Sequence, residues 1–342
     1  MIAAVFHGVA EGVRLEKVPV PEVKNPSDIL VKVHRCGVCG SDLATLEGRN
    51  VVRAPLIIGH EIGGEVIEVG NEVRLLKPGD HVTMIPDLSC GVCLYCRSNR
   101  RNLCPNMVAL GEHANGAFAE YLVAPESVIF KVPDDMPWDI IPLAEPLSCV
   151  VNGVVKTQLQ PGENAVVYGA GPIGLLWLSL LRRSGAGTLI SVEPREKRAE
   201  AARKVGADFV IDPTKVDPVA EVMRVTDGRG ADVAAELVGR TDTIEFAIRS
   251  AAYGGRVIIM GTSKPDALAC FAAYELMRYE KRIMGSYISN GNFQLAIDEL
   301  AKGFIPADVI ITHRLPIREI HLALELNKRG ESIKTLILPG QD

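Results

Sequence analysis

The sequence predicts an α/β protein in two parts, a β-rich part and a doubly wound parallel sheet, and three observations predict it. Within residues 1–150, short apolar alternations are separated by turns, which is typical of β-strands. From about 160 to 285 the pattern changes to strand, helix, strand, which favours a parallel sheet covered by helices. The 342 residues, 47% hydrophobic and 23% charged, suit two globular domains better than one.

The β-rich part contains three clear strand patterns. Apolar and polar residues alternate over 28–34 and again over 63–69. A Lys-Pro-Gly-Asp turn at 77–80 precedes a third strand expected at 81–85. This part also carries most of the cysteine and histidine side chains, which are able to bind metal.

The second part alternates five strand patterns with helical ones. The strands are expected at 165–168, 189–192, 209–211, 232–237 and 256–260. Helices are expected at 194–205 and 241–252, and amphipathic helices follow at 292–302 and 317–328. An apolar strand is expected at 335–338.

Charge and composition exclude several classes of partner. The net charge of −5 gives no basic surface for nucleic acid or for an anionic membrane. The uncharged run 164–181 has the length of a membrane span, but its glycines and proline divide it into a strand, a turn and a helix. The first residues lack the features of a signal peptide, so we expect a cytoplasmic protein.

A glycine-rich turn follows the first strand of the second part. The motif Gly-Ala-Gly-Pro-Ile-Gly consists of Gly169, Ala170, Gly171, Pro172, Ile173 and Gly174. Its first glycine permits the tight turn, the second permits close approach of a pyrophosphate, and the third permits packing of helix on strand. The amino terminus of the following helix attracts phosphate. A Rossmann-type domain that binds NAD is therefore predicted.

The choice between NAD and NADP depends on the end of the next strand. Glu193 lies about 20 residues beyond the last glycine, where a carboxylate binds the ribose hydroxyls and repels a 2′-phosphate. Arg195 and Arg198 follow it, and either would hold that phosphate. NAD is the favoured cofactor, with Glu193 and Arg198 as binding residues, and NADP remains the alternative.

Four of the eight cysteines share one short segment with the spacing C-x2-C-x2-C-x7-C. They are Cys90, Cys93, Cys96 and Cys104. Four thiolates close a tetrahedral shell around zinc and leave no position for substrate, which predicts a structural zinc site. An iron–sulfur cluster is the competing hypothesis, because it also accepts four cysteines.

A second, mixed set of metal-binding residues is spread along the β-rich part. It consists of Cys39 in Cys-Gly-Ser-Asp, His60 and Glu61 in Gly-His-Glu, and Glu145 in Glu-Pro-Leu. Fewer than four fixed ligands leave a position open for water or substrate, which is characteristic of catalytic zinc. The sequence thus predicts two zinc ions per chain.

Seven motifs occur in the order typical of one family. They are VCGSD (38–42), GHEIGGEVIEVG (59–70), KPGDHV (77–82), CGVCLYCRSNRRNLC (90–104), GAFAEY (116–121), EPLS (145–148) and GAGPIG (169–174). The chain resembles the zinc-dependent medium-chain dehydrogenase/reductase family, nearest its polyol (sorbitol) and threonine dehydrogenase branches. This resemblance implies a GroES-like catalytic domain, 1–150 with 286–342, around a Rossmann domain, 151–285, with a cleft between them.

The resemblance also implies roles for the mixed metal set. Cys39 and His60 correspond to catalytic zinc ligands, and Glu61 to the adjacent ligand of the polyol branch. Glu145 corresponds to the mobile ligand, or to a carboxylate that bonds the zinc water. Cys149, one helical turn later, is the alternative for that position.

The implied reaction transfers hydride from a secondary alcohol to NAD, with Ser41 receiving the proton of the alcohol. Two positions depart from the family pattern: Ala44 replaces a frequent relay histidine, and Ile288 replaces a substrate-binding arginine of sorbitol dehydrogenases. A water molecule beside Ala44 is the expected substitute for the histidine. We therefore expect a polyol, sugar or sugar acid as substrate, and a homo-dimer or homo-tetramer. Cys36 is interpreted as a core residue.

Two other functions remain open from the sequence. A threonine-type amino-alcohol dehydrogenase would need a partner for the substrate carboxylate, and the sequence indicates none. A non-catalytic NAD-binding relative would have no need to keep Cys39, His60, Glu61 and Glu145 together. The particular alcohol is not defined by the sequence.

Overall fold

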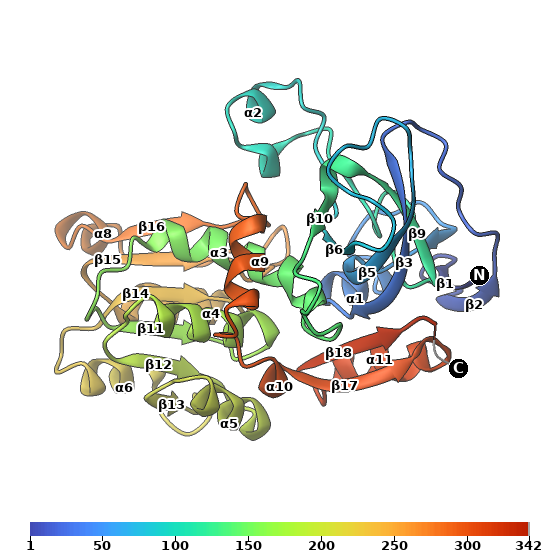
Figure 1. The fold of residues 1–342 in the computed structure, drawn as a ribbon. Helices are drawn as coiled ribbons and strands as arrows, with labels where there is room; N and C mark the ends of the chain where they lie inside the picture. The colour runs from blue at the N-terminus through green and yellow to red at the C-terminus, as the bar shows by residue number, and fades with distance from the viewer. Residues whose placement is uncertain (341–342) are drawn as a thin grey trace. The chain divides into compact units, whose positions relative to one another are not determined.

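A computed structural model describes residues 1–340 and divides them into two compact units (Figure 1). Unit 1 comprises 1–148, 289–303 and 311–340 of the described chain. Unit 2 comprises 149–288 and 304–310. We expected the boundaries after residues 150 and 285.

The main sheet of unit 1 combines strands from both ends of the chain. Its path is β10 (Ile129–Lys131), β6 (His81–Met84), β5 (Glu61–Val69), β3 (Asp28–Gly37), β18 (Lys334–Leu338) and β17 (Ile311–Pro316), and β9 (Tyr121–Pro125) also pairs with β3. β3 forms in the first strand pattern, and its inward side chains Ile29, Val31 and Val33 are fully buried. Cys36 is buried in the same core, as expected.

Smaller elements surround this sheet. Two further sheets contain β1 (Ile2–Phe6), β2 (Val13–Lys17) and β4 (Leu56–Ile57) in one, and β7 (Asp87–Leu88) and β8 (Val108–Ala109) in the other. The α-helices wholly in unit 1 are α1 (Gly40–Leu46), α2 (Leu94–Arg97), α9 (Phe293–Ala301) and α11 (Ile320–Arg329). The 3-10 helices are η1 (Arg101–Leu103), η2 (Glu126–Val128), η3 (Ile141–Leu143) and η4 (Ile317–Glu319).

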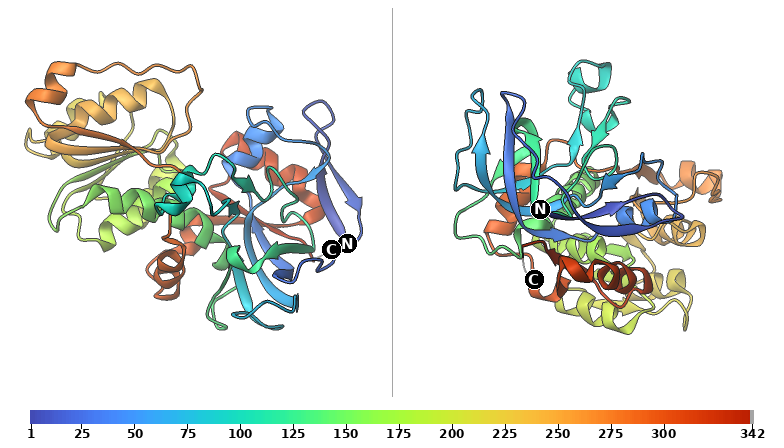
Figure 2. Two further views of the ribbon diagram at one scale, coloured as in Figure 1. Left: turned by 90° about the horizontal axis from the view of Figure 1, so that it is seen from above. Right: turned by 90° about the vertical axis from the view of Figure 1, so that its right-hand side faces the viewer.

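Unit 2 is a six-stranded parallel sheet with helices on both faces (Figure 2, left). The strand order is β13 (Phe209–Ile211), β12 (Leu189–Val192), β11 (Ala165–Tyr168), β14 (Ala231–Glu236), β15 (Ala251–Ile259) and β16 (Arg282–Gly285). Every neighbouring pair is parallel, which is the Rossmann order 3-2-1-4-5-6. The expected fold class is therefore confirmed.

The helices of unit 2 connect these strands. They are α4 (Pro172–Arg183), α5 (Glu196–Lys204), α6 (Pro218–Val225), α7 (Thr241–Ser250), α8 (Ala273–Arg278) and α10 (Ala307–Ile310). The longer α3 (Ala144–Thr157) begins in unit 1 and continues into unit 2. In the described chain, no helix is both long enough and apolar enough to cross a membrane.

The structure differs from the expected elements in three places. β16 is a sixth strand of the parallel sheet, where five were expected. Residues 304–310 were expected in the catalytic domain, but they belong to unit 2, because α10 packs against α5 and Arg183 lies over the Phe304 ring. β15 begins at Ala251 instead of residue 256, because a register shift lets Ala251 pair with Ala231 before the regular ladder starts.

Candidate functional site

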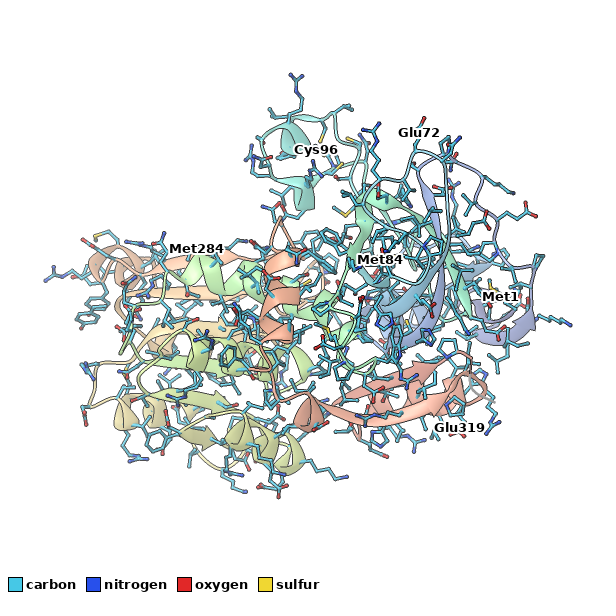
Figure 3. All side chains as sticks on the ribbon, viewed as in Figure 1. Met1, Glu72, Met84, Cys96, Met284 and Glu319 are labelled. Carbon is cyan, nitrogen blue, oxygen red and sulfur yellow. The ribbon has the colours of Figure 1, made fainter. Side chains whose placement is uncertain are left out.

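The four-cysteine segment forms a separate lobe around α2, which Figure 1 shows extending from the sheets of unit 1. Figure 3 labels Cys96 within it. All four thiols are free, and their sulfur atoms lie within 4.8 Å of one another. The measured Sγ–Sγ distances are 3.4 Å between Cys93 and Cys96, and 4.0 Å for both Cys90–Cys96 and Cys93–Cys104.

These distances test the fit of a metal. Tetrahedral zinc with Zn–S bonds of about 2.3 Å requires sulfurs roughly 3.8 Å apart, and the observed distances bracket that value. The backbone N–H of Cys90 and that of Cys96 donate to the sulfurs of Cys104 and Cys93, respectively. Such donors stabilise thiolates, so the lobe fits a closed zinc site.

A second metal-binding group in unit 1 consists of Cys39, His60 and Glu61, whose ligand atoms also lie within 4.8 Å of one another. Cys39 caps the amino terminus of α1, and its N–H donates to Asp42 at 2.8 Å. His60 and Glu61 come from the turn before β5 and from its first residue. Three donors from two segments match an open site.

Two polar side chains lie close to His60. Ser41 Oγ lies 3.4 Å from Nε2, and the carboxylate of buried Asp42 lies 3.7 Å from Nδ1. Burial disfavours the imidazolium, but Cys39, Asp42 and Glu145 outweigh it and raise the pKa of His60 well above its ordinary value. A carboxylate behind a ligand histidine is the usual outer-shell arrangement at zinc. Sequence reasoning missed Asp42, although it belongs to the same motif.

Glu61 is held by a buried lysine that the sequence analysis also missed. Lys334 Nζ donates to both carboxylate oxygens of Glu61 at 2.7 Å and to the carbonyl of Val38 at 3.1 Å. The two side chains are only 3% and 1% exposed. The only sequence signal is a lysine at the head of an otherwise apolar strand. Glu61 thus belongs to the metal-binding group, and its negative charge is balanced by the ammonium group of Lys334.

Glu145 lies in the first turn of α3 and is buried. Burial, with Glu61 and Asp87 adding repulsion, raises its pKa to about 7, and His60 and Lys334 act in the opposite direction. Its carboxylate therefore shares an electrostatic environment with the metal group, although it lies outside the cluster of three. Cys149 also lies outside that cluster.

Asp87 at the start of β7 is a further acidic group near this site. Burial raises its pKa to about 6, while His60 lowers it and Glu112 raises it. No motif identifies this residue in the sequence, because it stands alone before the cysteine segment.

The two departures from the family pattern also have clear positions. Ala44 is buried in α1 at 6% exposure, so the expectation of an open space for water beside it finds no support there. Ile288 has a φ of +38°, and its carbonyl accepts a hydrogen bond of 2.7 Å from Asn152. Left-handed backbone is unusual for a β-branched residue, and this bond helps to hold it.

The glycine turn of unit 2 has the geometry of a phosphate cradle. Gly169 has φ +96°, and a Cβ on Gly174 would lie 1.9 Å from the Gly169 carbonyl oxygen, so both positions require glycine. A Cβ on Gly171 would meet only Arg198 Nη1 at 3.7 Å, so the backbone there is open. Pro172 begins α4, and Ile173 follows it in the first turn.

Glu193 lies against this turn, directly after β12. Its carboxylate accepts the N–H of Ala170 at 2.8 Å and that of Arg195 at 3.0 Å. Arg198 is largely buried, and its Nε has no hydrogen-bond partner in the described structure. Burial lowers the pKa of Arg198 overall. The charge of Glu193 opposes this effect, and the charge of Arg195 adds to it. The predicted cofactor residues of unit 2 are thus gathered around one turn.

Glu236 ends β14 and was not singled out from the sequence. Its Oε1 accepts the N–H groups of Val238 and Gly239 and the hydroxyl of Thr243, each at 2.8 Å. It shapes the loop at the carboxyl edge of the sheet, beside the strand that carries the glycine turn.

Two family models match the chain. Residues 25–134 match the alcohol dehydrogenase GroES-like domain, and residues 172–302 match a zinc-binding dehydrogenase domain. The sorbitol dehydrogenase of Bacillus subtilis is 32% identical, over 100% of this chain and 98% of its own length. The L-threonine 3-dehydrogenase of Thermococcus kodakarensis is 34% identical, over 96% and 95%.

A solved structure agrees over the whole chain. The zinc-binding dehydrogenase of Sinorhizobium meliloti 1021, solved bound to NADP, has a TM-score of 0.95 and 33% identity, and the match covers 99% of each chain. Fold and metal groups together define a zinc-dependent dehydrogenase. The chain belongs to the zinc-dependent medium-chain dehydrogenase/reductase family, which confirms the resemblance seen in its motifs.

Proposed function

We propose that the protein oxidises a secondary alcohol of a polyol, sugar or sugar acid with NAD as hydride acceptor. The observation that carries this proposal is the open group of Cys39, His60 and Glu61 with Glu145 nearby, in a chain that also has a complete dinucleotide turn. The sorbitol dehydrogenase likeness supports a polyol substrate.

The donor set fits zinc: a thiolate, an imidazole and one carboxylate lie within 4.8 Å of one another in unit 1. Bound there, zinc supplies Lewis-acid polarisation of an alcohol oxygen, and the nicotinamide supplies the hydride acceptor. Cys39 and His60 hold the metal, Glu61 adds a carboxylate balanced by Lys334, and Glu145 completes the site from α3. Cys90, Cys93, Cys96 and Cys104 hold the structural zinc.

Proton transfer and the binding of metal and cofactor depend on groups of the chain itself. The Asp42 carboxylate lies 3.7 Å from His60 Nδ1 and acts on the ring through its charge, and Ser41 Oγ lies 3.4 Å from Nε2. Ser41 accepts the proton of the alcohol and passes it toward solvent. In unit 2, the glycine turn and the start of α4 hold the pyrophosphate, and Glu193 and Arg198 hold the adenosine end.

A substrate panel tests this function. Polyols, sugars, sugar acids and amino alcohols are each offered with NAD, and NADH absorbance is followed. The highest kcat/KM is expected for a polyol or sugar derivative. Preference for L-threonine would instead support an amino-alcohol dehydrogenase, for which the Thermococcus likeness is the supporting observation. Absence of turnover with two zinc ions bound would contradict both.

NAD is expected to be used at least ~10-fold better than NADP in kcat/KM, equivalent to roughly 1.4 kcal/mol. The reason is the Glu193 carboxylate, which would repel a 2′-phosphate. Glu193→Ser should narrow this difference, because Arg195 and Arg198 would then face the phosphate. Equal use of both cofactors by the wild type would contradict the assignment, and the NADP-bound Sinorhizobium relative makes this comparison necessary.

Ser41→Ala is expected to lower kcat by about 10²–10⁴-fold, because it removes the first proton acceptor. Ser41→Thr keeps a hydroxyl and is the matched control. The measurement is kcat against pH with a substrate for which a deuterium isotope effect shows that oxidation limits the rate. Near-normal turnover of Ser41→Ala under that condition would mean that the proton leaves by another route.

We also propose a homo-dimer or homo-tetramer in a reducing cytoplasm. Apolar side chains are exposed in and beside α8, next to β16, which is an unpaired edge in the described sheet: Leu268, Phe271, Tyr274 and Met277. Such an edge beside apolar surface favours association with a second copy. Within residues 1–340 the cysteines form no disulfide bond, which suits a reducing compartment. Sedimentation equilibrium would measure the state of association.

A further inference from the structure

We propose that Trp138 and Asp139 form an anchor that positions Glu145 for the metal site. The inference rests on the proposed role of Glu145 and assigns a function to two residues that touch neither metal nor cofactor. Both belong to unit 1, in the turn that leads into η3 and α3.

Asp139 connects two strands of the main sheet. Arg35 Nε of β3 donates to Oδ1 at 2.6 Å, and Arg314 Nε of β17 donates to Oδ2 at 2.5 Å. Burial would raise the pKa of Asp139, but the hydrogen bonds from the two arginines lower it overall. β3 and β17 lie on either side of β18, the strand that carries Lys334. The carboxylate therefore fixes the turn to both neighbours of that strand.

Trp138 connects a second pair of strands. Its ring packs against two histidines, with centroid distances of 4.1 Å to His34 of β3 and 4.2 Å to His81 of β6. These strands lie on either side of β5, which carries Glu61. Adjacent residues of one turn thus hold the strands that flank both members of the Glu61–Lys334 pair.

An irregularity in β3 makes this arrangement possible. Val33 pairs with Gly64 and Arg35 pairs with Gly63, so His34 is an extra residue in the ladder. Neighbouring strand residues normally point to opposite faces, and a bulge changes that direction. His34 and Arg35 consequently both reach the 138–139 turn. Bulges of this kind occur beside active sites, where they aim side chains.

The connection from the anchor to Glu145 is short and helical. Ile140 N–H donates to the Pro137 carbonyl at 2.9 Å, η3 follows, and α3 begins at Ala144. Ile141 also packs so closely on Gly63 that a Cβ there would lie 3.0 Å from it. A displacement at Asp139 would therefore move the first turn of α3, because no flexible segment lies between them.

The test compares Asp139→Asn with Asp135→Asn, a matched change at an exposed position of the preceding loop. Two quantities are measured. One is kcat, and the other is the rate at which a coloured chelator removes zinc from the open site, which should release its metal faster than the closed four-cysteine site. Asp139→Asn should lower kcat and speed zinc release by roughly 10-fold each, the usual effect of an outer-shell change. The KM for NAD should stay within about twofold of wild type, because unit 2 holds the cofactor. Asp135→Asn should change none of these quantities.

Two milder variants, Arg314→Gln and Trp138→Phe, distinguish a specific loss of the anchor from general misfolding. Arg314→Gln removes one of the two arginines paired with Asp139, at a partly exposed position, and leaves Arg35 in place, so it should reproduce a smaller form of the Asp139→Asn effect. Trp138→Phe keeps an aromatic ring against the histidines and should remain near wild type, whereas Trp138→Ala should not. If Asp139→Asn, Arg314→Gln and Trp138→Ala all behave like Asp135→Asn, the anchor proposal is wrong.

A double-variant experiment separates this inference from the proposed function. Glu145→Gln alone should lower kcat and speed zinc release, and adding Asp139→Asn should then change little, because both act through one group. If Glu145→Gln has no effect, the role of Glu145 itself is wrong. If Glu145→Gln acts but Asp139→Asn slows turnover equally in both backgrounds, the anchor does not work through Glu145.

Discussion

Cys39→Ser is expected to lower kcat by roughly a thousandfold or more, which corresponds to about 4 kcal/mol of transition-state stabilisation. The change removes the thiolate of the open metal group, and no other cysteine belongs to that group in the described structure. The variant should remain folded and hold one zinc, because the four-cysteine lobe is separate. Metal analysis, circular dichroism and turnover are measured on the same preparation.

Cys104→Ser is the matched control, since it makes the same substitution in the other metal site. It should lower the melting temperature by roughly 5–10 °C, because a structural zinc contributes folding free energy. Its turnover below the transition should fall much less than that of Cys39→Ser. A Cys104→Ser protein that melts like wild type, together with an unfolded Cys39→Ser protein, would mean that the two sites are reversed.

Lys334→Met is expected to destabilise unit 1 by about 3–5 kcal/mol, the usual result of leaving one buried charge without its partner. Glu61 would keep a carboxylate that is 1% exposed and would lose both of its Lys334 hydrogen bonds. Urea unfolding of the metal-free protein measures the free energy. The double variant Lys334→Met with Glu61→Gln should recover most of the loss, because the uncompensated charge is gone. Equal destabilisation of single and double variants would show that packing, not charge, is responsible.

Local sequence patterns predicted five of the six strands of unit 2, and β16 was missed. β11, β12 and β13 occur at the predicted residues, because each is a short apolar run between turn residues. β11 and β12 are fully buried, whereas β13 is a partly exposed edge strand. The four-cysteine spacing and the glycine turn were equally accessible, since each completes its geometry within one short segment. β15 was predicted too short, because its first residues pair through an irregular register that no periodicity indicates.

The features that could not be predicted from the sequence depend on contacts between residues far apart in the chain. Lys334 and Glu61 are 273 positions apart, and a lone lysine before an apolar strand has no visible partner. Asp139 and Arg314 are separated by 175 positions. The placement of 304–310 with unit 2 likewise depends on packing of α10 against α5, two helices far apart in the chain. Such pairs can be predicted only when the order of the strands in the sheet is already known.

The return of β17 and β18 to the main sheet of unit 1 has a consequence for biosynthesis. All of unit 2 is translated between β3 and its neighbour β18, so the first sheet stays incomplete on the ribosome while the Rossmann sheet can already close. During that interval the β3 segment that later pairs with β18 is an open edge, and the Glu61 carboxylate lacks its Lys334 partner. Nascent chains stalled before residue 334 should therefore need chaperone protection of this edge, whereas unit 2 should already resist proteases.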